Sequence, residues 1–214
     1  MPTDELNRVI PVISALCEAG AVVSVDTMRA VVAQEAINAG AMIVNDVSGG
    51  LADSEILHVV AASSATYVAM HWRSASATMQ GFAVYDNPGG VVHAVCDELR
   101  SRVGAALAQG VREDRLILDP GIGFAKKAEH NWELLRAIPQ LRQLGFPLLI
   151  GASRKAFLGL LLASDGVPRA VDRREQANVA LTVLLAQHQV WGVRVHDVRA
   201  ARDALEVWKV VTQT

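Results

Sequence analysis

The sequence is poor in features that mark several other protein classes. Its two cysteines, Cys17 and Cys96, lie in stretches of helical pattern and have no metal-ligand spacing, which argues against a disulfide framework. No apolar run reaches the length of a membrane span, and the first residues carry charges where a signal peptide has an apolar core. We therefore expect a cytoplasmic protein with no membrane partner.

Strong net charge and nucleotide-binding loops are missing as well. The formal net charge of −2 over 214 residues argues against a broad basic surface, so no nucleic-acid partner is expected, although a local anion pocket is compatible with it. The sequence has no GxGxxG or P-loop pattern. Aromatic residues make up 5% and hydrophobic residues 51% of the chain, a balance typical of the interior of a parallel sheet with its covering helices. The length predicts one domain, residues 1–214.

Short apolar runs bounded by turn residues alternate with segments of helical periodicity. The runs predict six strands, at residues 21–27, 41–47, 66–71, 116–119, 147–152 and 192–197. Helices are predicted at residues 4–17, 28–38, 53–62, 91–109, 130–138, 157–163, 174–187 and 200–211, and a long loop at 72–90. Strict βα alternation predicts a parallel α/β sheet with right-handed crossovers. An eight-stranded barrel takes about 250 residues, so a barrel of this chain would lack its first two strands.

Polar residues occur where the predicted strands end. Because side chains alternate along a strand, one face can hold all of these polar groups while the aliphatic residues between them face the helices. The arrangement gathers five residues at one mouth of the sheet: Asp26, Asn45, Asp119, Arg194 and His196. Carboxyl ends of parallel strands are the usual place for ligands.

Each of these residues has a plainer interpretation. Asp26 and Asp119 are also suited to capping the helix or forming the turn that follows, and Asn45 is suited to turn chemistry. His196 is compatible with a hydrogen-bonded core histidine. Arg194, if buried, needs an anion or a carboxylate such as Asp197.

Ser153-Arg154-Lys155 places two cations at the predicted start of a helix, where they oppose the helix dipole. An electron-rich ligand or a carboxylate such as Asp119 would compensate for this, and the alternative is that both side chains reach solvent. Carboxylate and amide acceptors beside a lysine donor suit the edge of an amino-pyrimidinone ring. Arginine, histidine and helix N-termini suit a phosphate. Together these groups indicate group transfer with a phosphate-type leaving group.

Six motifs, in this order, give the chain a resemblance to the dihydropteroate synthase family of folate biosynthesis. They are Val25-Asp26-Thr27, Asn45-Asp46-Val47-Ser48-Gly49-Gly50, Met70-His71, Asp119-Pro120-Gly121-Ile122-Gly123-Phe124, Gly151-Ala152-Ser153-Arg154-Lys155 and Arg194-Val195-His196-Asp197. The resemblance implies a (β/α)8 TIM barrel of the pterin-binding type, here with six of eight strands. It also implies an enzyme that joins 4-aminobenzoate to 6-hydroxymethyl-7,8-dihydropterin diphosphate and releases diphosphate.

The resemblance also assigns roles to residues. Pterin binding is implied for Asp26, Asn45, Val47, Met70, Asp119 and Lys155. Phe124 and Lys155 would border the 4-aminobenzoate site, and Arg194 and His196 would contact the departing diphosphate. The residues implied in catalysis are Lys155, Asp119, Arg194 and His196.

The chain departs from the family pattern at its start. Family members begin with a strand and a glycine-rich loop whose asparagine helps to hold Mg²⁺ and diphosphate, then a second strand with a Ser-Thr-Arg-Pro loop, and neither has a counterpart here. Mg²⁺ is the implied cofactor, without a protein ligand among the matched residues. A homodimer is expected, with Trp208, Val207 and Val210 as candidate contacts or, alternatively, as core. Two other functions stay open: a non-catalytic pterin-binding protein and a pterin-dependent methyltransferase.

Overall fold

The computed structural model describes residues 2–74 and 78–212 and divides into two compact units. The first unit consists of Met1–Arg73 and Val95–Asp119, and the second of Ser74–Ala94 and Pro120–Thr214. Each unit is described by itself below. The single domain that the length predicts stays a prediction.

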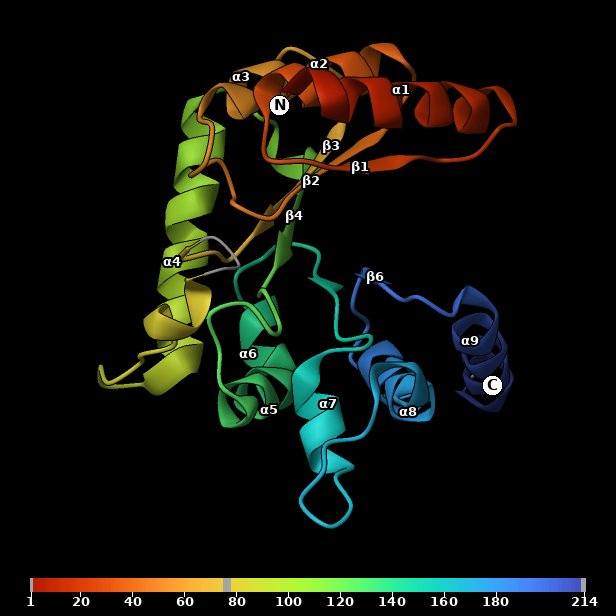
Figure 1. Cartoon of the computed structure of the whole chain (residues 1–214). Coiled ribbons are helices and arrows are strands. Elements are labelled where there is room, and N and C mark those ends of the chain that lie inside the picture. The colour runs from red at the N-terminus through yellow and green to blue at the C-terminus, as the bar shows by residue number, and fades with distance from the viewer. Residues whose placement is uncertain (1, 75–77, 213–214) are drawn as a thin grey trace. The chain divides into compact units, whose positions relative to one another are not determined.

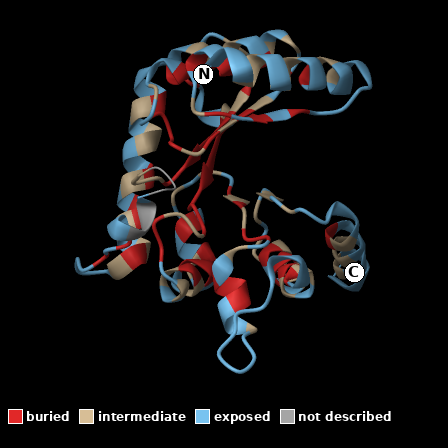
Figure 2. Cartoon of the chain, viewed as in Figure 1, coloured by how far each residue is buried: buried red, intermediate tan, exposed pale blue. Residues whose placement is uncertain are grey.

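A four-stranded parallel sheet is the centre of the first unit (Figure 1). Its strands β1 (Ser24–Asp26), β2 (Ile43–Asp46), β3 (Thr66–Met70) and β4 (Leu116–Asp119) lie in the order β1-β2-β3-β4. Every residue of β4 is buried, as expected for a strand that is covered on both faces (Figure 2). The parallel βα pattern read from the sequence is therefore confirmed, although β1 and β2 are shorter than predicted.

Helices α1 (Pro2–Glu18), α2 (Ala30–Asn38) and α3 (Glu55–Ala61) lie together on one side of this sheet (Figure 1). Pro11 lies inside α1 without ending it. Most of the long helix α4 (Gly90–Ala108) also belongs to this unit, and a 3₁₀ turn, Glu113–Arg115, leads into β4. Among the described residues, no helix is both long and apolar enough to cross a membrane.

The second unit contains the short parallel pair β5 (Leu149–Ile150) and β6 (Gly192–Val193) and most of the C-terminal helices. These helices are α5 (Ala128–Arg136), α6 (Ile138–Arg142), α7 (Ala156–Leu161), α8 (Glu175–Gln187) and α9 (Val198–Thr212). Two 3₁₀ turns, Met79–Phe82 and Val171–Arg173, complete it, and residues 75–77 of the predicted loop lie outside the described part.

Strand β6 is much shorter than the predicted strand at residues 192–197. The ladder continues for one further bond, from Arg194 N to Ile150 O at 2.9 Å. After it the chain turns into α9, where Asp197 Oδ1 accepts a hydrogen bond from Ala200 N at 3.0 Å. Asp197 is therefore used at the start of a helix, which the alternating pattern alone does not reveal.

The buried carboxylate of Asp46 fixes the turn after β2. It accepts hydrogen bonds from Ser48 N, Ser48 Oγ, Gly50 N and Tyr67 Oη at 2.7–2.8 Å, and it is fully buried. Burial raises the pKa of Tyr67, and the neighbouring Asp46 carboxylate raises it further, so the phenol stays a donor.

Asp46→Ala is expected to lower the free energy of unfolding by about 3–5 kcal/mol, because it removes four bonds and leaves buried donors unpaired. Tyr67→Phe removes one bond and should cost about 1–2 kcal/mol. Urea unfolding of both variants measures the difference. Equal losses of unfolding free energy in the two variants would contradict the conclusion that the Asp46 carboxylate fixes this turn.

Candidate active site

The strand register of the first unit brings its predicted pterin residues to one face and one end of the sheet. Asp26 lies beside Asn45, and Met70 lies beside Asp119. Residues that are partners in a parallel register point to the same side, and Asn45 pairs with Val68, two residues before Met70 on the same face. All four residues therefore share one face at the carboxyl ends of the strands, and Val47, half-buried, follows directly after β2.

Asn45 and Asp26 form a polar pair on this face. Asn45 Nδ2 donates a hydrogen bond to Asp26 Oδ2 at 3.1 Å. That bond directs the amide oxygen of Asn45 away from Asp26. The oxygen is buried, and among the described residues it has no hydrogen-bond partner. A buried acceptor of this kind needs a donor, which a ligand N–H can supply.

Neighbouring residues form the turn and the helix cap that were the plainer interpretations of Asn45 and Asp26. Turn chemistry belongs to Asp46, which faces away from Asn45. The first turn of α2 is capped by Asp53, whose Oδ2 accepts a bond from Ala30 N at 2.8 Å. Thr27 donates to Glu5 Oε1 at 2.8 Å. The carboxylate of Asp26 is therefore not used as the cap of this helix.

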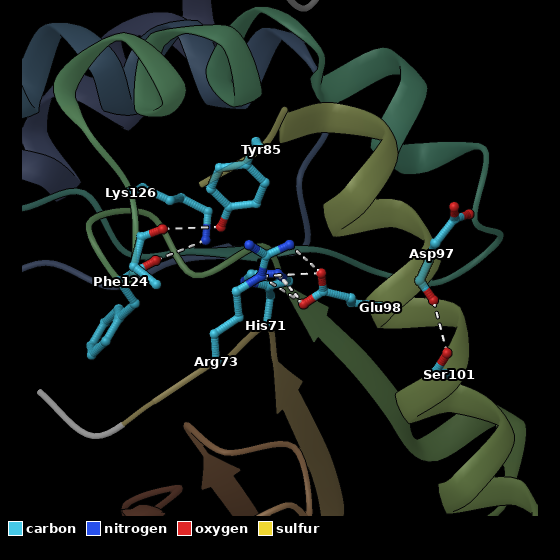
Figure 3. A network of polar contacts seen from close by, with 9 residues as sticks. His71, Arg73, Tyr85, Asp97, Glu98, Ser101, Phe124 and Lys126 are labelled. Carbon is cyan, nitrogen blue, oxygen red and sulfur yellow. Dashed lines mark hydrogen bonds and ion pairs between the residues drawn. The ribbon is translucent and has the colours of Figure 1, made fainter. Parts of the chain in front are cut away.

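A charge network around the buried His71 lies at the end of β3 (Figure 3). His71 Nε2 lies 2.9 Å from Glu98 Oε2, and Arg73 Nε lies 3.1 Å from both oxygens of the same carboxylate. The backbone N–H of His71 also donates to Asp119 O at 2.8 Å, which continues the β3–β4 ladder by one residue. Glu98, on α4, is a partner that the sequence motifs did not indicate.

The stability of this network should depend on pH. Burial raises the pKa of the Glu98 carboxyl, but hydrogen bonds and charges from His71 and Arg73 outweigh burial and lower it from 4.5 to about 2. Because the folded-state pKa is depressed, the stabilisation is present above about pH 4.5 and is lost as the pH falls towards 2. With the carboxylate partly exposed, we expect about 1–2 kcal/mol from it. Unfolding of the wild type and of Glu98→Gln should converge over this range, and parallel pH profiles would contradict the assignment.

In the second unit, the turn after Asp119 carries the predicted aminobenzoate residues. Gly123 has φ +81°, and a Cβ built on it would lie 2.8 Å from Lys155 Cδ, so only glycine fits there. The Lys155 ammonium lies 3.9 Å from the centre of the Phe124 ring, within the range of a cation–π contact. Lys155 is the N-cap residue of α7, so the two cations of the Ser153-Arg154-Lys155 motif precede the helix.

Arg194 and His196 are neighbours at the end of β6. Arg194 Nη1 lies 2.8 Å from His196 Nε2, and His196 Nδ1 lies 2.9 Å from Ser153 Oγ. Burial, then the charges of Arg194 and Arg154, lower the pKa of His196. A neutral imidazole that accepts at Nε2 and donates at Nδ1 to Ser153 satisfies all three groups.

The plainer interpretations of Arg194 and His196 do not hold. Both side chains are exposed, so His196 is not a core histidine and Arg194 is not a buried cation. Asp197 does not pair with Arg194, because it serves the first turn of α9. The exposed guanidinium of Arg194, at the carboxyl end of the strand, still has donors that can meet an anion from solvent.

The structure thus groups the predicted residues within each unit. The first unit brings together Asp26, Asn45, Met70 and Asp119. The second joins Phe124 to Lys155 and Arg194 to His196. Ser153 was noticed only as part of a motif, and the buried Asn131 of α5 was missed, because an isolated asparagine in a helix gives no sequence signal.

Parallel βα units with carboxylate, amide and cationic side chains at the strand ends define a class, the α/β enzymes that bind a small polar ligand at this edge of the sheet. The sequence matches the family described as pterin binding enzyme over residues 2–196. The dihydropteroate synthase of Mycobacterium leprae is 49% identical over 209 residues, which cover 96% of this chain and 72% of that protein. The enzyme of Synechocystis is 46% identical, over 95% of this chain and 68% of its own length.

Solved structures that resemble this chain are also dihydropteroate synthases. Dihydropteroate synthase from Thermus thermophilus in complex with 6HMPPP has a TM-score of 0.89 and 37% identity, over 99% of this chain and 80% of that one. The enzyme of Xanthomonas albilineans in complex with 7,8-dihydropteroate has a TM-score of 0.88 and 36% identity, over 100% and 76%. The chain therefore belongs to the dihydropteroate synthase family of pterin-binding enzymes. The predicted fold class is confirmed, with six strands in the described residues.

Proposed function

We propose that this chain condenses 4-aminobenzoate with 6-hydroxymethyl-7,8-dihydropterin diphosphate to give 7,8-dihydropteroate and diphosphate. The observation that carries the proposal is the common face of Asp26, Asn45 and Asp119, where the buried amide oxygen of Asn45 has no hydrogen-bond donor among the described residues. The relatives that bind 6HMPPP, 4-aminobenzoate and 7,8-dihydropteroate support the same substrates.

In this proposal the first unit recognises the pterin. Carboxylates of Asp26 and Asp119 and the amide oxygen of Asn45 accept hydrogen bonds from the N–H groups of the ring. The apolar side chains of Met70 and Val47 cover its surface. Asp119 is 8% exposed, which strengthens any charge-assisted bond that it makes.

The second unit supplies the cations. Lys155 and Phe124 border the 4-aminobenzoate, and Arg194 and His196 receive the diphosphate. In the reaction, the bond from the pterin methylene carbon to the diphosphate oxygen breaks with its electron pair. The amine nitrogen of 4-aminobenzoate forms the new bond to that carbon and loses a proton. Catalysis rests on orientation and leaving-group stabilisation, without a covalent nucleophile.

In this proposal Mg²⁺ enters the site bound to the diphosphate of the substrate. Within residues 2–74 and 78–212, no three His, Cys, Asp or Glu side chains are grouped to hold a metal ion. Mg²⁺ commonly binds through one or two carboxylates together with substrate phosphates. None of the steps above uses the metal.

A homodimer in the cytoplasm is also proposed. Val207 and Val210 are 66% and 77% exposed on α9, which supports these residues as contacts with a second copy. Trp208, between them, is half-buried and contributes to the packing of α9 instead.

The proposal is tested with the purified chain, both substrates and Mg²⁺, by following diphosphate release and dihydropteroate formation. Product that requires both substrates is the expected result. Pterin binding by calorimetry without product, at any Mg²⁺ concentration, would favour a non-catalytic pterin-binding protein. Methyl transfer to a cobalamin partner protein would identify a methyltransferase and reject the synthase.

A further inference from the structure

The turn that follows β4 has an unusual backbone. Gly121, Gly123 and Ala125 have φ values of +68°, +81° and +47°. Ala125 is not a glycine, so its left-handed conformation is costly and persists only if the surroundings hold it. Such strain is often found beside functional groups.

Three buried side chains hold this turn, and each bonds to a different peptide unit. Asn131 Oδ1 accepts a hydrogen bond from Gly123 N at 2.6 Å. Lys126 Nζ donates to Phe124 O, and Tyr85 Oη donates to Ala125 O, both at 3.0 Å (Figure 3). The residues that supply the side chains are 2%, 3% and 8% exposed, so water competes little with these bonds.

Asn131 is itself fixed in orientation. Its Nδ2 donates to Lys127 O at 2.7 Å, one helical turn earlier on α5. This bond leaves Oδ1 pointed at Gly123, so the amide joins α5 to the strained turn. A buried asparagine costs desolvation that a leucine would not, and both of its polar atoms are used here.

The position of Gly123 determines that of Lys155. The lysine stem lies against the Gly123 backbone at a distance that excludes a Cβ, and the ammonium lies over the ring of Phe124. A shift of the Gly123 peptide therefore changes the surface against which the Lys155 stem packs. Because Phe124 is the next residue, the same shift also moves the ring under the Lys155 ammonium.

We propose that Asn131 is a positioning residue of the aminobenzoate site: with Tyr85 and Lys126 it holds the turn that places Phe124 against Lys155. The effect on aminobenzoate binding rests on the proposed function. The placement of Lys155 by the turn does not rest on it, so the two effects can be tested separately.

The experiment compares Asn131→Ala with Asn178→Ala. Asn178 is a matched control, because it is a buried helical asparagine of the same unit, 3% exposed, whose Nδ2 bonds Glu175 within α8 and not the turn. Tyr85→Phe is the second variant, which removes one hydroxyl and keeps the packing. Two quantities are measured: the KM values for the two substrates, and the rate of acylation of Lys155 by an amine reagent, mapped by mass spectrometry.

For Asn131→Ala we expect the KM for 4-aminobenzoate to rise about tenfold, since small misplacements are costly. The KM for the pterin should rise less, because several side chains besides Lys155 are assigned to the pterin. Acylation of Lys155 should become about two- to fivefold faster as the cation–π contact loosens. Tyr85→Phe should show smaller changes in the same direction. Asn178→Ala should lower the thermal midpoint without changing either quantity.

Unchanged acylation and an unchanged ratio of the two KM values in Asn131→Ala and Tyr85→Phe would overturn the proposal. Equal effects in Asn178→Ala would overturn it too, because they would show a general loss of packing. If the wild type formed no dihydropteroate while Lys155 acylation still rose in Asn131→Ala, the proposed function would fail and the positioning role would stand.

Discussion

Lys155→Ala is expected to lower the rate of dihydropteroate formation at least about a hundredfold, as does the removal of a preorganised donor in other active sites. The stem of Lys155 lies close to Gly123 and its ammonium lies over the Phe124 ring, so we expect its position to be set before substrate arrives. Lys155 is half-buried at the N-cap of α7, and truncation should cost little stability. Steady-state diphosphate release measures the effect.

Lys127→Ala is the matched control for this variant. Lys127 is also an N-cap lysine with extended backbone, at the start of α5 in the same unit, but its side chain is exposed. Its carbonyl, which accepts the bond from Asn131, remains in the variant. Turnover close to wild type is expected for Lys127→Ala. Equal turnover in both variants would remove Lys155 from the mechanism.

Asp119→Asn should weaken pterin binding about a hundredfold, because it replaces a charge-assisted acceptor pair with a neutral amide that turns one N–H towards the donors of the ligand. The substitution keeps the shape of the side chain at the end of a fully buried strand, so the fold should survive. Calorimetry with the pterin substrate, without aminobenzoate, measures binding apart from turnover.

Asp114→Asn controls for the loss of one negative charge. Asp114 lies in the 3₁₀ turn before β4 and is paired with Arg112 at the surface, where Arg112 lowers the pKa of its carboxyl. An exposed pair of this kind contributes little. If Asp119→Asn bound the pterin as tightly as Asp114→Asn, the carboxyl end of β4 would not be the pterin site.

The polar face of the first unit was predictable from the sequence for a simple reason. Side chains alternate along a strand, and parallel strands align their carboxyl ends, so Asp26, Asn45 and Asp119 had to share a face once the strands were recognised. The same reasoning extended the last strand too far. The alternating pattern does not indicate that Asp197 forms the cap of α9, where the strand has already ended.

The partners of these residues were not predictable. Asp46 and Asn45 are adjacent in sequence and chemically similar. The Asp46 carboxylate accepts hydrogen bonds from the turn and from Tyr67, while the amide oxygen of Asn45 has no donor among the described residues. Only the register of β3 decides which of the two meets the phenol.

The sequence by itself determined the α/β class, the strand ends that carry polar side chains and the glycine turn after β4, because strand periodicity and turn preferences act over a few residues. Tertiary structure alone decided that Glu98 pairs with His71, that Ser153 meets His196 and that Asn131 holds Gly123. These partners are distant in the chain or hidden in a regular helix, and hydrogen-bond geometry exists only once the elements have packed.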